Sequence, residues 1–407
     1  METEISRKSS TKCKKKHFKP KHQKSKLFRA NEPLLSVFMW GINHTVNELN
    51  HVNIPVMLMP DDFRASTKIR VDNHLYQKDV MPSHFKVKEY CPLVFRNLRE
   101  RFSIHDSDYL KSLTKFQPVA ADSLSGRPTK FYSTYDNQLI LKTLSADEVE
   151  NMHHLLKEYH PYIVERYGQT LLPQYLGMYR LTVGTKEATY IVVMRNIFNR
   201  RLPIHRKYDL KGSNPDREAS EKERGKDLPC FKDNDFLKDG VKLYLDLESK
   251  NKLITTLEAD TAFLARENLI DYSLCLGIHD CGKYQQELSE LNSPRSTSSN
   301  DDEDETAGDS GSPKEVSGAG GIVTGGVGSS GEGGINDAMQ VDDSTTGIGI
   351  INSTPSQAGG EKQIYFLGLV DVLTQFGLRK RIVTIDPEQY RKKFMEFIAK
   401  AVVTPTE

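Results

Sequence analysis

The sequence has few of the features that mark disulfide-rich, zinc-binding or membrane-spanning proteins. Its five cysteines are scattered over 407 residues without a C-x-x-C pair, so we expect neither a disulfide framework nor a cysteine-bound metal. This use of cysteine also indicates a reducing compartment. No apolar run reaches the roughly 18 residues that a membrane span needs, and the basic N-terminus lacks the apolar core of a secretory signal. We therefore expect a cytoplasmic protein whose contact with membranes is peripheral.

Familiar phosphate-handling motifs are also missing. There is no G-x-x-x-x-G-K-[ST], which excludes a P-loop, and neither H-R-D nor D-F-G, which argues against an ordinary protein kinase. A glycine-rich lid would have to lie at 122–132, where Gly126 is the single glycine. Histidines show no metal-ligand spacing. The basic tail alone suggests a nucleic-acid-binding protein, but the sequence contains no motif that supports this function. We therefore expect no nucleic-acid partner.

Charge is present but unevenly distributed. The net charge is +1, yet residues 284–362 carry −11 and hold 15 of the 27 glycines, which leaves +12 on all other residues. This acidic Gly/Ser-rich segment has too little apolar surface to offset its ordering entropy, so we predict a disordered insert. Residues 1–25 are predicted to form a basic disordered tail. The basic body favours an anionic partner such as a nucleotide or an anionic membrane surface.

Hydrophobic periodicity predicts an α+β protein with a sizeable antiparallel sheet. Ser145 and Glu148 form the sequence pattern of a capping box, and Asp386 is a second helix start. The predicted elements are helices at 33–52, 145–164, 252–270 and 386–402, a hairpin at 130–144, and strands at 188–198, 272–280 and 364–371.

Two lysines and two aspartates are candidates for phosphate chemistry. Lys142 stands inside an apolar strand, where a lysine is costly unless it meets an anion such as a nucleotide phosphate. Lys211 lies in K-Y-D-L-K-G-S, beside a glycine that permits close backbone approach. Asp271 precedes one apolar strand, and Asp371 follows another. Phosphoryl transfer needs one carboxylate at the attacking hydroxyl, another for Mg²⁺, and a lysine on the phosphates.

Each of these candidates also has an ordinary structural interpretation. Lys142 could sit at a strand edge with its head in water, a Lys-Gly turn is commonplace, and either aspartate could be a cap or turn residue. The hypothesis of phosphoryl transfer depends on the presence of all four residues together.

Several longer stretches identify a family. Residues 26–65, K-Y-D-L-K-G-S, residues 217–236, I-D-Y-S-L-C-L-G-I-H-D and Y-F-L-G-L-V-D-V-L-T closely resemble the type II phosphatidylinositol phosphate kinases, the phosphatidylinositol 5-phosphate 4-kinases. The resemblance covers about 26–283 and 363–401. It implies a phosphatidylinositol phosphate kinase fold, distantly protein-kinase-like, with antiparallel sheets in two lobes. The lipid kinase domain would span 26–283 and 363–407, with the small lobe at about 26–195.

The resemblance also implies an activity and roles for the candidate residues. The protein would transfer the ATP γ-phosphate to the 4-hydroxyl of phosphatidylinositol 5-phosphate, with Mg²⁺ as a further cofactor. Lys142 would bind the ATP phosphates, and Lys211 would contact phosphate near the transferred group. Asp271 would be the catalytic aspartate, and Asp371 would hold Mg²⁺.

Three further residues would belong to the nucleotide site by the same resemblance. Residues 194–198 would form the hinge beside the base, with Asn196 and Phe198 nearest to it, and Gly126 would lie in the lid. A flat basic membrane face and dimerisation through the N-terminal region are also implied. The protein would work at the plasma membrane or endomembranes, and a nuclear pool is compatible with the basic tail, which can be interpreted as a localisation signal or as lipid-facing charge.

The segment after Asp371 departs from the family. Fourteen residues separate Asp371 from Asp386, where the resemblance implies a longer loop that selects the lipid head group. At about 3.3 Å per residue the short loop can close, but it cannot project far. Its basic cluster, Arg379, Lys380 and Arg381, is a candidate lipid or membrane contact, or alternatively a solvated charge run. The alternative function is therefore a weakly active or inactive dimeric phosphoinositide-binding scaffold.

Overall fold

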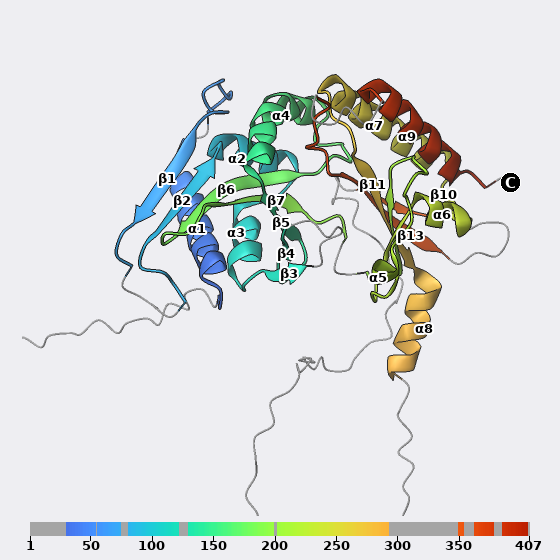
Figure 1. The fold of residues 1–407 in the computed structure, drawn as a ribbon, viewed down its shortest axis with the longest axis horizontal. Helices are drawn as coiled ribbons and strands as arrows, with labels where there is room; N and C mark the ends of the chain where they lie inside the picture. Colours follow the sequence, from blue (N-terminus) through green and yellow to red (C-terminus); the bar gives the residue numbers. More distant parts are fainter. Residues whose placement is uncertain are drawn as a thin grey trace, which may run out of the picture.

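The computed structural model describes residues 30–53, 55–74, 80–121, 129–198, 202–292, 349–353, 362–377 and 385–405. These residues form two sheet-based lobes that lie next to each other (Figure 1). The predicted α+β class with antiparallel sheets is confirmed. Gly126 and the basic cluster of Arg379, Lys380 and Arg381 lie outside the described residues, as does the tail at 1–25.

The small lobe is a seven-stranded sheet in the order β1-β2-β6-β7-β5-β4-β3. All neighbouring strands are antiparallel, and helices α1 and α2 pack on β6. The strands are β1 Ser66–Val71, β2 Phe85–Tyr90, β3 Val119–Ala121, β4 Phe131–Ser133, β5 Leu139–Leu144, β6 Tyr175–Val183 and β7 Thr189–Arg195; the helices are α1 Pro33–Leu49, α2 Pro92–Arg101, α3 Asp106–Thr114 and α4 Ala146–Glu165.

The large lobe is a five-stranded sheet in the order β12-β13-β11-β8-β9, in which only β8 and β9 are parallel. Helices α7 and α9 pack against each other above this sheet in Figure 1. The elements are β8 Arg206–Leu210, α5 Glu221–Arg224, β9 Cys230–Lys232, α6 Asp233–Lys238, β10 Leu243–Tyr244, α7 Leu247–Arg266, β11 Ser273–Asp280, α8 Cys281–Asn292, β12 Gly349–Asn352, β13 Gln363–Val370, α9 Pro387–Ala401 and β14 Val402–Val403.

The helix-start signals in the sequence are confirmed in the structure. The Ser145 hydroxyl accepts a hydrogen bond from the Glu148 backbone N–H at 3.2 Å, and the Glu148 carboxylate accepts from the Ser145 N–H at 2.8 Å. Asp386 likewise accepts from the backbone N–H of Gln389 at 2.9 Å. These bonds satisfy backbone donors that the helix itself leaves free. The start of α4 matters most here, because it fixes the first turn of that helix directly behind β5.

Two described parts of the segment predicted as a disordered insert have regular structure instead. Helix α8 continues to Asn292, and Gly349–Asn352 forms strand β12, which pairs with β13. The amino-acid composition averaged over 284–362 conceals a short apolar run around Ile350 and Ile351. The backbone of this run forms the outer strand of the sheet beside β13. Residues 293–348 and 354–361 lie outside the described residues, and their disorder stays a prediction.

A buried carboxylate ties the two lobes together. Asp260 of α7 is fully buried and accepts hydrogen bonds from the Tyr162 hydroxyl at 2.6 Å, the Thr170 hydroxyl at 2.7 Å and the Leu171 N–H at 2.6 Å. The Leu171 carbonyl then accepts from the N–H of Leu369 in β13 at 2.7 Å. Burial raises the pKa of Asp260, although its hydrogen bonds oppose that effect.

We expect Asp260→Ala to lower the free energy of unfolding by about 3 kcal/mol, because it leaves several buried donors without an acceptor. Urea denaturation measures the change. Glu258→Ala is the matched control, since Glu258 lies on the exposed side of the same helix. If the two variants are equally stable, Asp260 does not hold the lobes together.

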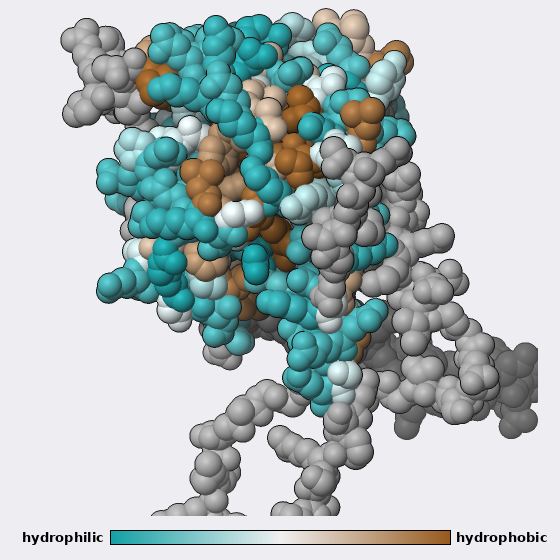
Figure 2. Space-filling view, turned by 90° about the vertical axis from the view of Figure 1, so that its right-hand side faces the viewer, coloured by the Kyte–Doolittle hydropathy of each residue, from teal (hydrophilic) through white to brown (hydrophobic). Residues whose placement is uncertain are grey.

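The outer face of the large lobe is largely polar. Figure 2 views the molecule from the right-hand side of Figure 1 and shows hydrophilic residues over most of this face, with hydrophobic residues in groups between them. Leu237 and Leu247 are among the exposed apolar side chains of this lobe, at 54% and 64%. Among the helices that the structure describes, none has both the length and the apolar composition needed to cross a bilayer.

Candidate active site

The two candidate aspartates lie at the edge of the large-lobe sheet where strand β11 begins and strand β13 ends. Strands β11 and β13 are antiparallel neighbours with Ser273 opposite Val370, so the start of one strand lies beside the end of the other. Asp271 stands two residues before that pair and Asp371 one residue after it. Both have left-handed backbones, with φ of +67° and +58°. Such conformations cost free energy in a non-glycine residue, and they concentrate at functional sites.

Backbone hydrogen bonds join the loop that contains Asp271 to the segment that follows Asp371. The Ile270 N–H donates to the Thr374 carbonyl at 3.0 Å, and the Phe376 N–H donates to the Asn268 carbonyl at 2.8 Å. The two short segments thus form a ribbon that continues the β11–β13 pairing beyond the strand ends. The relative position of the two carboxylates is therefore set by backbone and does not depend on side-chain packing alone.

Lys142 reaches across from the small lobe to this edge. Its Nζ lies 3.2 Å from Asp371 Oδ1 and 3.6 Å from Glu148 Oε1, and its side chain is 13% exposed. Lys142 therefore meets anions, as the strand position predicted, and its head does not simply extend into water. Asn151, one turn further along α4, donates to the Leu373 carbonyl at 3.2 Å, so α4 also holds the segment after Asp371.

Glu148 is a site residue that the sequence interpretation missed. Its capping bond explained its presence fully, and so no second role was assigned. The available signal was its position in the first turn of a helix that directly follows the Lys142 strand. A lysine paired with a glutamate of the next helix is a recurring arrangement in kinases.

Lys211 completes a second ion pair at the same edge. Strand β8 pairs with β11, with Leu210 opposite Leu274, which brings the residue after β8 close to Asp271. Lys211 Nζ lies 2.6 Å from Asp271 Oδ1. The site thus contains two lysine–aspartate pairs, one contributed by both lobes and one within the large lobe.

The predicted hinge is held by contacts of its own residues. The Asn196 side chain donates to the Asn137 carbonyl at 2.9 Å and accepts from the Phe198 N–H at 3.1 Å. The Phe198 ring rests on Gly277 of β11, where an added Cβ would lie 2.5 Å from the ring. A glycine is therefore required at position 277 for the predicted hinge to pack closely against the large lobe. That Asn196 and Phe198 are nearest the base remains a prediction.

The carboxylate of Asp371 is suited to a magnesium ion that arrives with a nucleotide. Its side chain is 47% exposed, and among the described residues no group of three or more His, Cys, Asp or Glu side chains could hold a metal ion. Mg²⁺ bound with substrate phosphates commonly uses one or two protein carboxylates and keeps several waters. A single accessible aspartate therefore fits, whereas a permanent metal cage does not.

Two lobes joined by a hinge, a lysine that crosses between them and carboxylates at the sheet edge define a phosphotransferase of the kinase type. The family model for phosphatidylinositol-4-phosphate 5-kinase matches residues 118–401. The chain is 47% identical over 412 residues to phosphatidylinositol 5-phosphate 4-kinase type-2 alpha of Gallus gallus, covering 96% of each chain. It is also 47% identical over 408 residues to the type-2 beta protein of Homo sapiens, covering 95% of this chain and 93% of the relative.

The chain therefore belongs to the phosphatidylinositol phosphate kinase family, which confirms the resemblance seen in its motifs. It is a kinase, and membership of this family implies ATP as the phosphate donor. The two relatives named above are both named as 5-phosphate 4-kinases, which agrees with the resemblance of residues 26–65 and the other motifs to the type II kinases.

We expect Glu148→Gln to lower kcat/KM for ATP by roughly fivefold, because it removes a long ion pair, 3.6 Å between Lys142 and Glu148, whose loss changes the free energy by about 1 kcal/mol. Glutamine can still accept the capping bond, so helix stability should be retained. Glu150→Gln, on the exposed face of the same helix, is the control. Steady-state kinetics with varied ATP measures both. Equal values for the two variants would mean that Glu148 does not support Lys142.

Proposed function

We propose that the protein transfers the γ-phosphate of ATP to the 4-hydroxyl of phosphatidylinositol 5-phosphate, giving phosphatidylinositol 4,5-bisphosphate. The observation that carries this proposal is the pair of lysine–aspartate contacts at one sheet edge, Lys142 with Asp371 and Lys211 with Asp271. The names of the relatives support the choice of substrate.

Each of these residues would have a distinct task in the reaction. Asp271 would orient the 4-hydroxyl and take its proton as the new oxygen–phosphorus bond forms and the bond to the ADP oxygen breaks. Lys211, at 2.6 Å from Asp271, would place positive charge next to the transferred phosphoryl group. Lys142 would bind the nucleotide phosphates. Mg²⁺, held by Asp371, would neutralise charge that develops on the β- and γ-phosphates when bound.

The proposal includes a membrane surface and a second copy of the chain. The +12 charge outside residues 284–362 supports peripheral binding to anionic lipid, because each basic residue near such a surface contributes about 1 kcal/mol. Strand β1 is one of the two terminal strands of the small-lobe sheet in the described part of the chain, and its outer edge suits pairing with a partner strand. Arg379, Lys380 and Arg381, which lie outside the described residues, remain proposed lipid contacts.

The test is formation of the bisphosphate on phosphatidylcholine vesicles that contain phosphatidylinositol 5-phosphate, with Mg-ATP. We expect the native protein to form product well above an Asp371→Asn control. A native protein that binds these vesicles without forming product above that control would favour the scaffold interpretation that the short loop suggested.

A further inference from the structure

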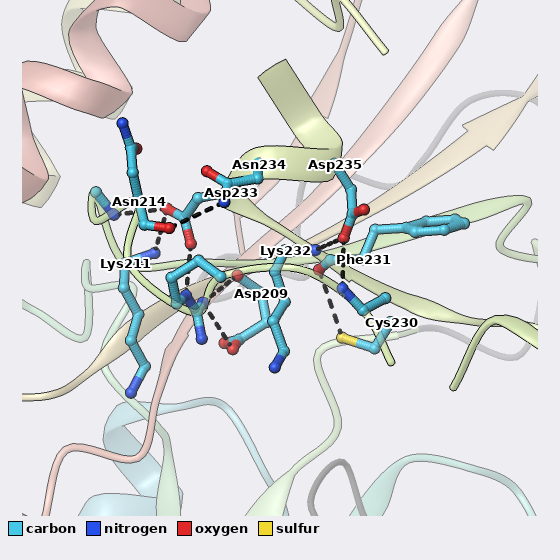
Figure 3. Close-up of polar contacts among 12 residues, drawn as sticks. Asp209, Lys211, Asn214, Cys230, Phe231, Lys232, Asp233, Asn234 and Asp235 are labelled. Atoms are coloured by element: carbon cyan, nitrogen blue, oxygen red, sulfur yellow. Dashed lines mark hydrogen bonds and ion pairs between the residues drawn. The ribbon is translucent and has the colours of Figure 1, made fainter. Parts of the chain in front are cut away.

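A buried carboxylate lies directly behind the Lys211 turn. Asp233, the first residue of α6, has no solvent exposure, and one of its oxygens accepts hydrogen bonds from two consecutive backbone N–H groups, those of Lys211 at 2.9 Å and Gly212 at 2.8 Å. Figure 3 shows Asp233 directed at this turn, while the Lys211 side chain extends away from it. Charged acceptors of this kind form hydrogen bonds roughly twice as strong as neutral ones.

The turn has little freedom to move in other directions. Gly212 has φ of +69°, and a Cβ added there would lie 2.8 Å from Phe394 Cα and 2.9 Å from the Lys393 carbonyl oxygen. Helix α9 therefore closes one side of the turn, and Asp233 binds its amide groups on another. A backbone confined in this way determines where the Lys211 side chain begins.

An arginine closes the network on the far side of Asp233. Arg217 Nε donates to the second Asp233 oxygen at 2.7 Å, and its Nη2 donates to Asp209 Oδ2 at 3.0 Å. Asp209 belongs to β8, two residues before Lys211. Burial by itself lowers the pKa of Arg217, but the carboxylates of Asp209 and Asp233 raise it overall. The guanidinium thus stays charged and links the end of β8 to the start of α6.

We propose that Asp233 is a positioning residue for phosphoryl transfer: it fixes the Lys211 turn so that Lys211 Nζ is held at Asp271. This inference rests on the proposed function, because Lys211 and Asp271 act there. Asp233 touches neither of the reacting groups. Its effect passes through the backbone of Lys211 and Gly212, and small displacements of aligned groups are known to cost up to about a hundredfold in rate.

The chain offers a closely matched control in Asp235. This second carboxylate of α6 is 3% exposed and accepts hydrogen bonds from the backbone N–H groups of Ala219 at 2.8 Å and Lys232 at 3.0 Å. In Figure 3 it points away from the Lys211 turn. Asp235→Asn therefore removes a buried charge from the same short helix without touching the turn.

We expect Asp233→Asn to lower kcat by about thirtyfold or more with little change in the KM for ATP. Asparagine has a single acceptor oxygen and cannot accept from both the turn and Arg217. Asp235→Asn should keep kcat within about threefold of the native protein, because the bonds from Lys211 and Gly212 to Asp233, and with them the alignment of Lys211, are retained. Equal losses of kcat in the two variants would overturn the proposal.

A double-mutant cycle with Lys211→Ala separates positioning from general loss of structure. If Asp233 acts through Lys211, the double variant should be no slower than Lys211→Ala alone, because groups that act as a unit are not additive. Additive losses would contradict the proposal. Thermal unfolding of every variant accompanies the kinetics, so that a folding defect is recognised.

Hydrogen exchange followed by mass spectrometry gives a reading that needs no lipid kinase activity. Asp233→Asn should speed exchange of the Lys211 and Gly212 amides by about tenfold or more, whereas Asp235→Asn should leave them protected. Protection that is unchanged in Asp233→Asn would overturn the positioning role even if the native protein shows no turnover. A failure of the proposed activity alone would appear as faster exchange in Asp233→Asn together with a native protein that forms no product.

Discussion

We expect Asp271→Asn to lower kcat about a thousandfold while binding of ATP is retained. The carboxylate would orient the attacking hydroxyl and accept its proton, and such acid–base catalysis contributes between about a hundredfold and ten-thousandfold. Asparagine cannot take the proton, and it removes the charge partner of Lys211 at 2.6 Å. Initial rates of lipid phosphorylation at saturating ATP measure the loss, and nucleotide titration measures the binding.

Asp280→Asn is the matched control for this variant. Asp280 ends β11, the strand that Asp271 precedes, and its side chain accepts from the backbone N–H of Gly282 at 3.1 Å, a bond that asparagine can also accept. Its rate should stay near that of the native protein. Retention of substantial activity in Asp271→Asn would show that another group activates the hydroxyl.

Asp371→Asn should lower kcat by at least about a hundredfold and raise the Mg²⁺ concentration needed for half-maximal rate, because a metal ion supplies several kcal/mol of charge stabilisation in the transition state. Asparagine tolerates the left-handed backbone that Asp371 adopts, so the fold should be preserved. Rates measured across a range of Mg²⁺ concentrations test the prediction. An unchanged Mg²⁺ dependence would contradict the role assigned to Asp371.

The strand-end residues could be predicted from sequence because their signal is local. Asp271 and Asp371 each border an apolar run, and Lys142 interrupts one, so each stands out against its neighbours. The meeting of Asp271, Asp371 and Lys211 at one edge follows from the pairing of β11 with β13 and of β8 with β11. That pairing could be inferred only from the family, since periodicity alone does not fix strand order.

Residues with two roles, or with a role exercised through the backbone, could not be predicted in the same way. Glu148 already had a complete explanation as a capping residue. Asp233 and Asp235 are two acidic residues in one polar stretch, and nothing in the sequence distinguishes the one that holds the Lys211 turn. The distinction depends on tertiary contacts between α6, the turn and α9. Likewise, β12 is stabilised by the edge of β13 and not by its own composition.

The most direct test of the account compares the three phosphatidylinositol monophosphates as substrates on identical vesicles and determines which hydroxyl is phosphorylated. Under the proposed function, the 5-phosphate is the preferred substrate and the new phosphate lies on the 4-hydroxyl, giving the 4,5-bisphosphate. Preferred phosphorylation of the 4-phosphate on its 5-hydroxyl, or the absence of any product from all three lipids, would contradict it.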